Sequence, residues 1–230
     1  MKIRTCSLDE ALAAVADDMS IGLGGVLGRR RPLALCAGLV ATGRTGLHAY
    51  SFLAGAEIET LVAGGAVASI TSGYLDPAGR TGAADRAIED GRVEWREVSE
   101  QLFVGGLRAA AAGLPFWPTL GAVGSDVAER LDLREIRCPY SGRPVLALPA
   151  TPLDVTLLHA EAATQHGAVL APVEREFLDD ADVILARAAK QVIVTVDRIA
   201  SADEAAGGRR TMLAPFEVAA VVWVPEDGRR

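Results

Sequence analysis

Apolar and polar positions alternate in blocks along the chain, and their period changes repeatedly between helical and extended. In residues 7–19 (SLDEALAAVADDM), Leu8, Leu12 and Val15 share one helical face, and Ser7 and Glu10 form a capping box. Residues 20–25 (SIGLGG) predict a short buried strand that runs into a glycine-rich loop, and 33–43 predict a second helix. A strand, a glycine turn and a helix in succession are the units of a parallel α/β layer.

The same succession continues along the chain. The pattern predicts strands over 46–55, 68–75 and 92–99, separated by helices over 56–67, 81–91 and 100–113, and an ordered apolar loop over 113–118. Continuous apolar runs at 153–160, 191–199 and 217–225 are typical of strands covered on both faces, and 174–190 supplies a helix. We expect a single α/β domain over residues 1–230, with an open, mostly parallel sheet and helices on both faces.

Composition and charge narrow the class of protein. Half of the 230 residues are hydrophobic, but no apolar run reaches the roughly 18 residues of a membrane helix. The segment MKIRTCSLDE lacks the apolar middle of a signal peptide, so we expect a cytoplasmic protein with no membrane partner. A net charge of −7 argues against nucleic acid as a partner. Three widely spaced cysteines favour reduced thiols over disulfides or a metal cage.

The glycine-rich loop is the first candidate site. Gly22, Gly24, Gly25 and Gly28 are followed directly by Arg29, Arg30 and Arg31. Glycine permits close approach of a ligand, and guanidinium groups pair with phosphate or carboxylate, so the loop indicates an anionic ligand. The alternative is a tight turn packed on a neighbouring strand. A dinucleotide fingerprint fits less well, because the third glycine is misplaced and no acidic residue ends the next strand.

Carboxylates and histidines provide the remaining candidates. Glu94, Glu97 and Glu100 recur every three residues, either as a solvated acidic face or with one of them as a general base. Glu100 falls in the first turn of a predicted helix, but the spacing alone does not favour it over Glu97. His159 ends an apolar strand, where parallel sheets place ligand sites, and is equally compatible with a structural role. His48 lies in an apolar strand and is expected in the core. No pair of histidines has metal-ligand spacing with a third partner, so we expect no metal site.

Taken together, several blocks resemble one protein family. These blocks are IGLGG with RRRP, ITSGY, GRVEWREVSEQLFVGGLRAAAAGLPF, GSD, LDVTLLHAEAATQHG and VIVTVDRI with APFEVAAVVWVP. In this order they resemble the α (A) subunit of family I coenzyme A-transferases, in the glutaconate CoA-transferase-like branch. The resemblance runs over almost the whole chain. Its most specific part is the E-x-x-E…LRAxAxGLPF block.

The resemblance implies a fold, a partner and a reaction. The fold would be the open α/β sheet shared with ribose-phosphate-isomerase-like proteins, paired with a β subunit of similar fold in a heterotetramer. Coenzyme A would be a substrate and not a permanently bound cofactor. It would move from an acyl-CoA to a carboxylic acid through a thioester on a glutamate of the β subunit. A covalent intermediate divides this transfer into two easier steps.

The resemblance also assigns site residues. The glycines at 22–28 would line the cleft that faces the thioester, and Arg29, Arg30 or Arg31 would hold a carboxylate or a CoA phosphate. Ser72, His159 and Gly167 match positions in the family's substrate-binding blocks. Three departures stand out: Ala168 replaces an asparagine, Gly73 separates Ser72 from Tyr74, and larger relatives continue beyond VPEDGRR.

Two alternative functions follow from the same residues. A divergent branch of the fold opens a ring of a steroid-derived CoA thioester by hydrolysis, using a glutamate in a motif like I-E-x-R-E-x-[SD]-E. This chain has VEWREVSE, with Glu100 in the equivalent place, so Glu100 would act there as a base on water or on the ring ketone. The other alternative is a non-catalytic, ligand-binding relative that has kept the fold.

Overall fold

The computed structural model describes residues 6–75, 82–174, 178–201, 204 and 207–224. Its centre is a parallel sheet with the strand order β12-β10-β8-β1-β2-β3-β4. The strands are β1 (Ser20–Leu23), β2 (Leu47–Ser51), β3 (Val67–Ser72), β4 (Glu94–Glu97), β8 (Leu153–Thr164), β10 (Ala189–Ala200) and β12 (Ala220–Trp223). Two short antiparallel strands, β9 (Val169–Leu170) and β11 (Thr211–Leu213), extend the sheet beside β8.

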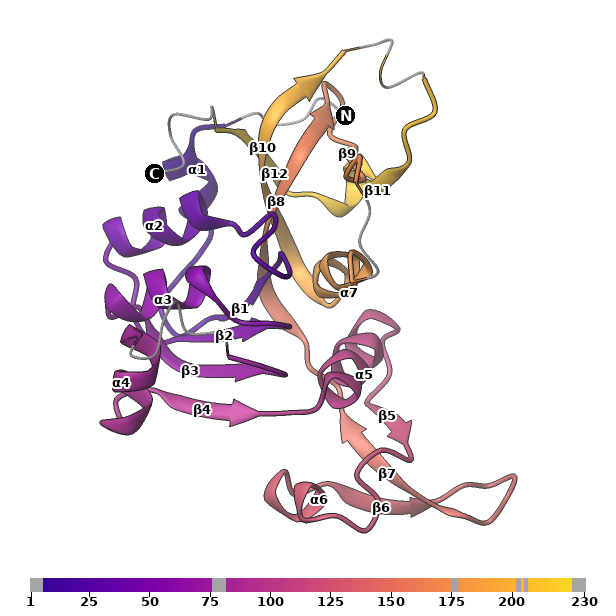
Figure 1. Cartoon of the computed structure of the whole chain (residues 1–230). Helices are drawn as coiled ribbons and strands as arrows, with labels where there is room; N and C mark the ends of the chain where they lie inside the picture. Colours follow the sequence, from indigo (N-terminus) through magenta and orange to yellow (C-terminus); the bar gives the residue numbers. More distant parts are fainter. Residues whose placement is uncertain (1–5, 76–81, 175–177, 202–203, 205–206, 225–230) are drawn as a thin grey trace.

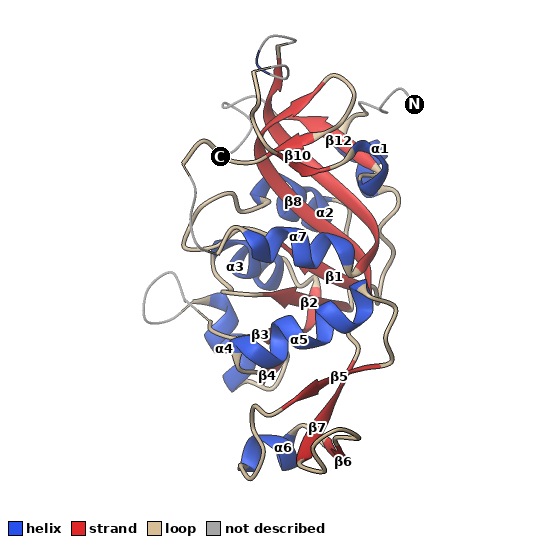
Figure 2. Cartoon of the chain, turned by 90° about the vertical axis from the view of Figure 1, so that its right-hand side faces the viewer, coloured by secondary structure: helices blue, strands red, loops and turns tan. Residues whose placement is uncertain are grey.

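Helices cover both faces of this sheet. The first layer holds α1 (Leu8–Leu12), α2 (Leu33–Ala41), α3 (Ala56–Ala63) and α4 (Ala83–Glu89), and the second holds α5 (Glu100–Ala111) and α7 (Asp180–Arg187). The two layers lie on opposite sides of the strands in Figure 1, and α5 and α7 lie in front of the sheet in Figure 2. The open, mostly parallel α/β sheet predicted from the sequence is confirmed.

The central strands form the core, and three elements differ in length from those predicted. Ile21 and Leu23 of β1 pack with Leu157 of β8 and Ile193 of β10, all at most 1% exposed. The capping box of Ser7 and Glu10 is present, but α1 ends at Leu12, so the helix predicted over 7–19 is too long. Conversely, β8 and β10 each run for 12 residues and pair over nearly their whole length. β8 continues four residues beyond the strand predicted over 153–160, whereas β10 exceeds the strand predicted over 191–199 by two residues at its start and one at its end.

A second, antiparallel sheet projects from one end of the molecule, at the bottom of Figure 1. It consists of β5 (Phe116–Thr119), β7 (Pro144–Pro149) and β6 (Arg134–Arg137), with α6 (Asp126–Arg130) beside it. The loop predicted over 113–118 is therefore wrong from residue 116 onward, because Phe116–Thr119 pairs with β7. Pro118 is tolerated there because β5 is an edge strand.

Two chemical expectations concern the whole chain. None of the helices in the described residues is both long enough and apolar enough to span a bilayer. The three cysteine thiols form no disulfide, as expected from their spacing. Cys36 of α2 is completely buried, and this burial raises the pKa of its thiol well above the ordinary value.

Candidate active site

The candidate site lies along the edge of the sheet where the parallel strands end. Parallel strands direct their carboxyl ends to one edge, where ligands bind in open α/β sheets. Three segments at this edge carry predicted site residues: the loop 24–32 after β1, Ser72 at the end of β3, and residues 98–100 after β4. Strands β8 and β10 continue past the end of β1, because Leu23 is level with Leu157 and seven residues of β8 follow.

The loop after β1 folds into a tight hairpin turn. Val26 and Arg29 exchange two backbone hydrogen bonds of 3.2 and 2.9 Å across Leu27 and Gly28. Both central residues have positive φ, 49° and 75°, as a type I′ turn requires. Gly28 adopts a positive φ without steric cost. Leu27 and Arg30 (φ 51°) also adopt a positive φ, but for them it is unfavourable because they carry a side chain. Surrounding contacts therefore hold this loop in a strained conformation.

Contacts within the chain account for three of the glycines. A Cβ atom on Gly22 would lie 2.5 Å from Thr156 Oγ1, and one on Gly24 would lie 2.3 Å from Leu158 Cδ2. Gly25 has a φ of +87°, and its backbone N–H donates to Asp182 Oδ1 at 2.7 Å. Close packing of β1 against β8 and α7 thus requires these glycines, which was the structural alternative. Their predicted role in ligand approach stays a prediction.

The three arginines after the turn differ in their surroundings. The Arg30 guanidinium is 8% exposed and lies 2.5 Å from Asp179 Oδ1 and 3.6 Å from Asp182 Oδ2. Arg31 is equally buried and pairs with Glu57. Buried carboxylates thus neutralise Arg30 and Arg31, although Arg30 also lines the cavity around His159 described below, so the anion-binding role predicted for these arginines stays a prediction. Arg29 is half-exposed and lies 3.5 Å from Glu174 Oε2.

Asp182 of α7 links this loop to the helix. Asp182 is 1% exposed, and burial raises the pKa of its carboxyl above the ordinary value, against the opposing effects of Gly25 N–H and Arg30. Asp179 and Asp182 were not identified from the sequence as site residues. They lie about 150 residues from the loop, and no local pattern reveals which acid faces which arginine.

His159 lies in a polar cavity beneath the same loop. Its Nδ1 is 3.0 Å from Thr195 Oγ1, and its Nε2 is 2.9 Å from Asp197 Oδ1. The cavity has a volume of about 490 Å³. It is lined by Arg29, Arg30, His159, Glu161, Val173, Glu174 and Asp197. The sequence did not identify Asp197, which reaches His159 because Thr195 pairs with His159 in the β8–β10 register. In the sequence, Asp197 could have been noticed as a carboxylate that interrupts the apolar run of β10.

Glu100 stands at a different part of the edge. It is exposed and begins α5, where Ser99 Oγ caps the helix by accepting from Leu102 N at 3.3 Å. A Cβ atom on Gly73 would lie 3.5 Å from Glu100 Cγ, so the glutamate's stem packs over Gly73. Strands β1 and β2 separate β3 from β8, roughly 14 Å across the sheet. The structure therefore does not bring Glu100 and His159 into one pocket.

The other predicted residues are also placed. Ser72 is buried, and its Oγ accepts from Trp95 Nε1 at 3.2 Å, so its hydroxyl faces the interior. Gly167 has a φ of +87° in the turn between β8 and β9, about seven residues of strand beyond the edge at Leu157. His48 is exposed and bonded to Ser69 Oγ at 2.8 Å. The core position predicted for His48 is therefore wrong: its side chain belongs to an open part of the sheet face.

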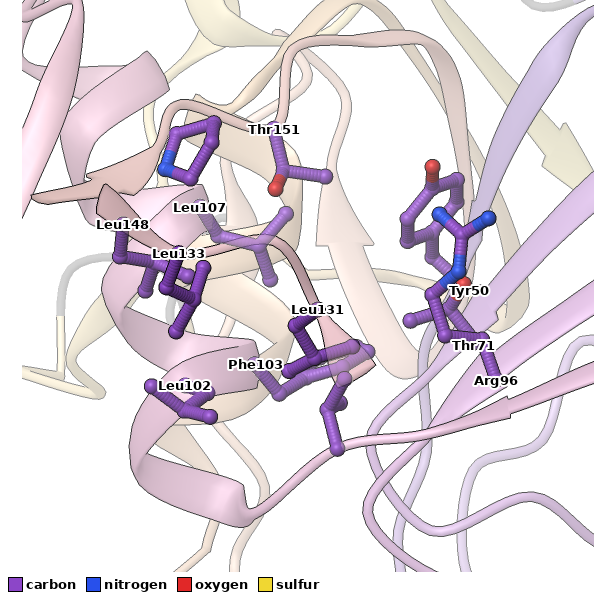
Figure 3. A pocket seen from close by; sticks show the side chains of 12 residues that line it. Tyr50, Thr71, Arg96, Leu102, Phe103, Leu107, Leu131, Leu133, Leu148 and Thr151 are labelled. Atoms are coloured by element: carbon purple, nitrogen blue, oxygen red, sulfur yellow. The ribbon is translucent and has the colours of Figure 1, made fainter. Parts of the chain in front are cut away.

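A second cavity, which we call the α5 pocket, lies between α5 and strands β2 to β4 (Figure 3). Its volume is about 160 Å³. Its lining residues are Tyr50, Thr71, Arg96, Val98, Leu102, Phe103, Leu107, Leu131, Leu133, Leu148, Pro149 and Thr151. The sequence analysis did not identify this pocket, because its walls come from five separate segments of the chain.

Comparison with known proteins places these features in a family. Residues 5–212 match the family model described as coenzyme A transferase. The cholesterol ring-cleaving hydrolase IpdA subunit of Rhodococcus jostii is 32% identical, over 86% of this chain and 69% of its own length. The crystal structure of the decarboxylase AibA/AibB shares 34% identity and a TM-score of 0.84, covering 100% of this chain and 86% of that one. Glutaconate coenzyme A-transferase from Acidaminococcus fermentans shares 27% identity and a TM-score of 0.84, covering 97% and 76%.

Coverage limits what carries over from these relatives. The chain spans about half the length of a curated relative from Archaeoglobus fulgidus, to which it is 31% identical over 98% of its own length. The family model nevertheless matches most of the chain, and the parallel sheet is the one found in glutaconate coenzyme A-transferase. The chain therefore belongs to the coenzyme A transferase family, as a relative of its A subunits.

Proposed function

We propose that this chain is the A subunit of a two-chain enzyme that transfers coenzyme A from an acyl-CoA to a carboxylic acid. The B subunit would supply the glutamate that carries the covalent thioester. Support comes from the family match and from similarity to the glutaconate and 3-oxoadipate CoA-transferase A subunits, at 29% and 28% identity.

One structural observation carries the proposal: the carboxyl edge of the sheet is open. Glu100 is exposed over Gly73, and the cavity around His159 opens to solvent instead of enclosing a ligand. A carboxylate attacks a thioester efficiently only when it is positioned and desolvated. A second protein surface against this edge would provide both the nucleophile and the exclusion of water.

The proposed transfer proceeds by exchange at two carbonyl carbons. The B-subunit carboxylate attacks the thioester carbonyl, which releases the CoA thiolate and leaves an acyl–glutamyl anhydride. The thiolate then attacks the glutamyl carbonyl, which frees the first acid and forms a glutamyl–CoA thioester. The acceptor carboxylate then attacks the glutamyl–CoA thioester, which releases the CoA thiolate and forms a second anhydride. The thiolate attacks the acyl carbonyl of this anhydride, which gives the new acyl-CoA and frees the glutamate. In this scheme the A subunit positions the acyl group and the acceptor, and the strained loop at 24–31 shapes the cleft.

The second candidate function is hydrolysis of a ring in a CoA thioester. It is favoured by the exposed carboxylate of Glu100 at the start of α5 and by the 32% identity to a ring-cleaving hydrolase subunit. The dipole of α5 stabilises negative charge at this position. Glu100 would accept a proton from the water that adds to the ring ketone. The ring C–C bond beside that carbonyl would then break, so that the ketone carbon becomes a carboxylate and the other carbon takes up a proton, and no group of the B subunit would become covalently attached.

Borohydride trapping of the co-expressed A and B subunits distinguishes these reactions. Transfer predicts a B-subunit glutamate reduced to its alcohol after incubation with acyl-CoA, and turnover that depends on an added carboxylate. Hydrolysis predicts no adduct, turnover without an acceptor, and a loss of more than about 100-fold in Glu100→Gln. Glu97→Gln is the matched control, because Glu97 is an exposed carboxylate three residues earlier. A complex that neither forms the adduct nor consumes acyl-CoA would refute both.

A further inference from the structure

The α5 pocket has one hydrocarbon wall and one polar wall. Leu102, Phe103 and Leu107 project from α5, and Leu131, Leu133 and Leu148 come from the chain around the second sheet. Figure 3 shows these side chains facing Tyr50, Thr71 and Arg96 on the other side. A pocket that is mostly apolar, with a few polar groups gathered on one side, is typical of small-molecule sites.

The volume limits the size of the ligand. A cavity of about 150 Å³ lined by apolar side chains holds one benzene molecule. At about 160 Å³, the α5 pocket accommodates a group of similar size, about six carbon atoms. A two-carbon group would leave most of the leucine surface unpaired, and a four-ring system would not fit.

The polar wall defines the chemistry at one end of the ligand. Tyr50, Thr71 and Arg96 are register partners on β2, β3 and β4, so their side chains line up on one face of the sheet. All three can donate hydrogen bonds. Arg96 also pairs with Glu94 at 3.1 Å, but its side chain is 54% exposed, and Figure 3 shows it on the same side of the pocket as Tyr50 and Thr71. This wall therefore suits an oxygen acceptor such as a carboxylate or a thioester carbonyl.

The pocket adjoins the start of α5. Val98 and Leu102, two residues on either side of Glu100, both line it. We propose that the α5 pocket binds the hydrocarbon portion of the substrate: a six-carbon ring, or an equally compact branched group, attached to a carboxyl-derived carbon. The ligand enters as a free carboxylate or as its CoA thioester. This inference rests on the proposed function for the identity of the ligand, but the binding itself is testable without turnover.

Calorimetric titration of the full-length chain in complex with its B subunit tests the pocket directly. The probes are cyclohexanecarboxylate and acetate, and then cyclohexanecarbonyl-CoA and acetyl-CoA. Each buried methylene strengthens binding about fourfold, so we expect cyclohexanecarboxylate to bind at least about 100-fold more tightly than acetate. A preference seen with the free acids identifies the carboxylate as a ligand, and one seen only with the thioesters identifies the acyl-CoA.

Two pairs of variants localise the binding. Leu131→Trp fills the pocket from a half-buried position and should abolish the preference for the ring, whereas Leu114→Trp, at an exposed leucine outside the pocket, should preserve it. Arg96→Gln should weaken binding about tenfold. Its control is Arg92→Gln, because Arg92 pairs with Asp90 at the same 3.1 Å but does not line the pocket.

Each outcome decides the inference. The pocket assignment would be overturned if the cyclohexane-containing probes bound no more tightly than acetate and acetyl-CoA. It would also be overturned if Leu131→Trp kept the preference for the ring, even if the complex transfers CoA. A ring preference that Leu131→Trp abolishes would support the pocket even if borohydride traps no adduct. The failure of the pocket is thus distinguishable from the failure of the proposed function.

Discussion

The buried pair of Arg31 and Glu57 gives the sharpest stability prediction. Glu57 is 0% exposed and Arg31 7%, and the pair joins the loop after β1 to the first turn of α3. Glu57 Oε1 also accepts hydrogen bonds from Ser51 Oγ at 2.9 Å and from Gly55 N at 3.1 Å. Glu57→Gln preserves an oxygen for both donors and removes only the charge that balances Arg31.

The expected cost follows from the burial of the remaining charge. Breaking a buried ion pair by neutralising one partner costs about 3–5 kcal/mol. For a chain of this size, about 2–4 °C of melting temperature correspond to each kcal/mol, so Glu57→Gln should melt roughly 6–20 °C lower. Arg31→Met should lose a similar amount, because it leaves the Glu57 carboxylate buried without a counter-charge.

Urea denaturation of the single variants and the double variant, followed by circular dichroism, tests this reasoning. Removing both charges relieves the uncompensated charge, so the double variant should be more stable than the sum of the single losses predicts, by at least about 2 kcal/mol. Losses that add to within about 0.5 kcal/mol would refute the pairing, as would a cost below about 1 kcal/mol for Glu57→Gln.

Three further predictions concern separate features. Hydrogen bonds from Lys190 and then Ser20 lower the pKa of Asp154 from 3.8 to about 2, so its stabilising effect is present above pH 4 and lost as pH falls toward 2. Asp154→Asn should remove this part of the acid dependence in a circular dichroism titration, whereas Asp126→Asn, at an exposed aspartate, should leave it unchanged. Identical pH profiles for Asp154→Asn and the unmodified chain would contradict this prediction. Gly24→Ala should cost about 1–3 kcal/mol in urea denaturation, because its Cβ would overlap Leu158 of β8 and Asp182 of α7; a stability gain would show that these two side chains pack differently. Glu100→Gln should lower the free energy of unfolding by no more than about 1 kcal/mol, since the side chain is exposed and loses only its interaction with the dipole of α5, and a larger loss would assign Glu100 a structural role.

The order of strands and helices could be predicted from the sequence because local periodicity reports burial. The alternation of β1, α2, β2 and α3, the capping box at Ser7 and the helix start at Glu100 are all properties of neighbouring residues. The resemblance carried by the GRVEWREVSEQLFVGGLRAAAAGLPF block also belongs to the sequence alone. The sequence alone also indicates that positions 24 and 25 require glycine. It does not decide whether the reason is close approach of a ligand or close packing within the chain.

Tertiary structure decided which groups meet. The sequence shows three arginines in a row, but only the fold places Asp179 and Asp182 against Arg30 and Glu57 against Arg31. The pairing of β8 with β10 likewise sets Asp197 beside His159, and the second sheet brings leucines from 131–148 to α5. Periodicity specifies which side of an element is buried, whereas contacts between distant residues depend on strand order and register. The predicted elements were therefore mostly right, while the partners of their charged side chains emerged only from the fold.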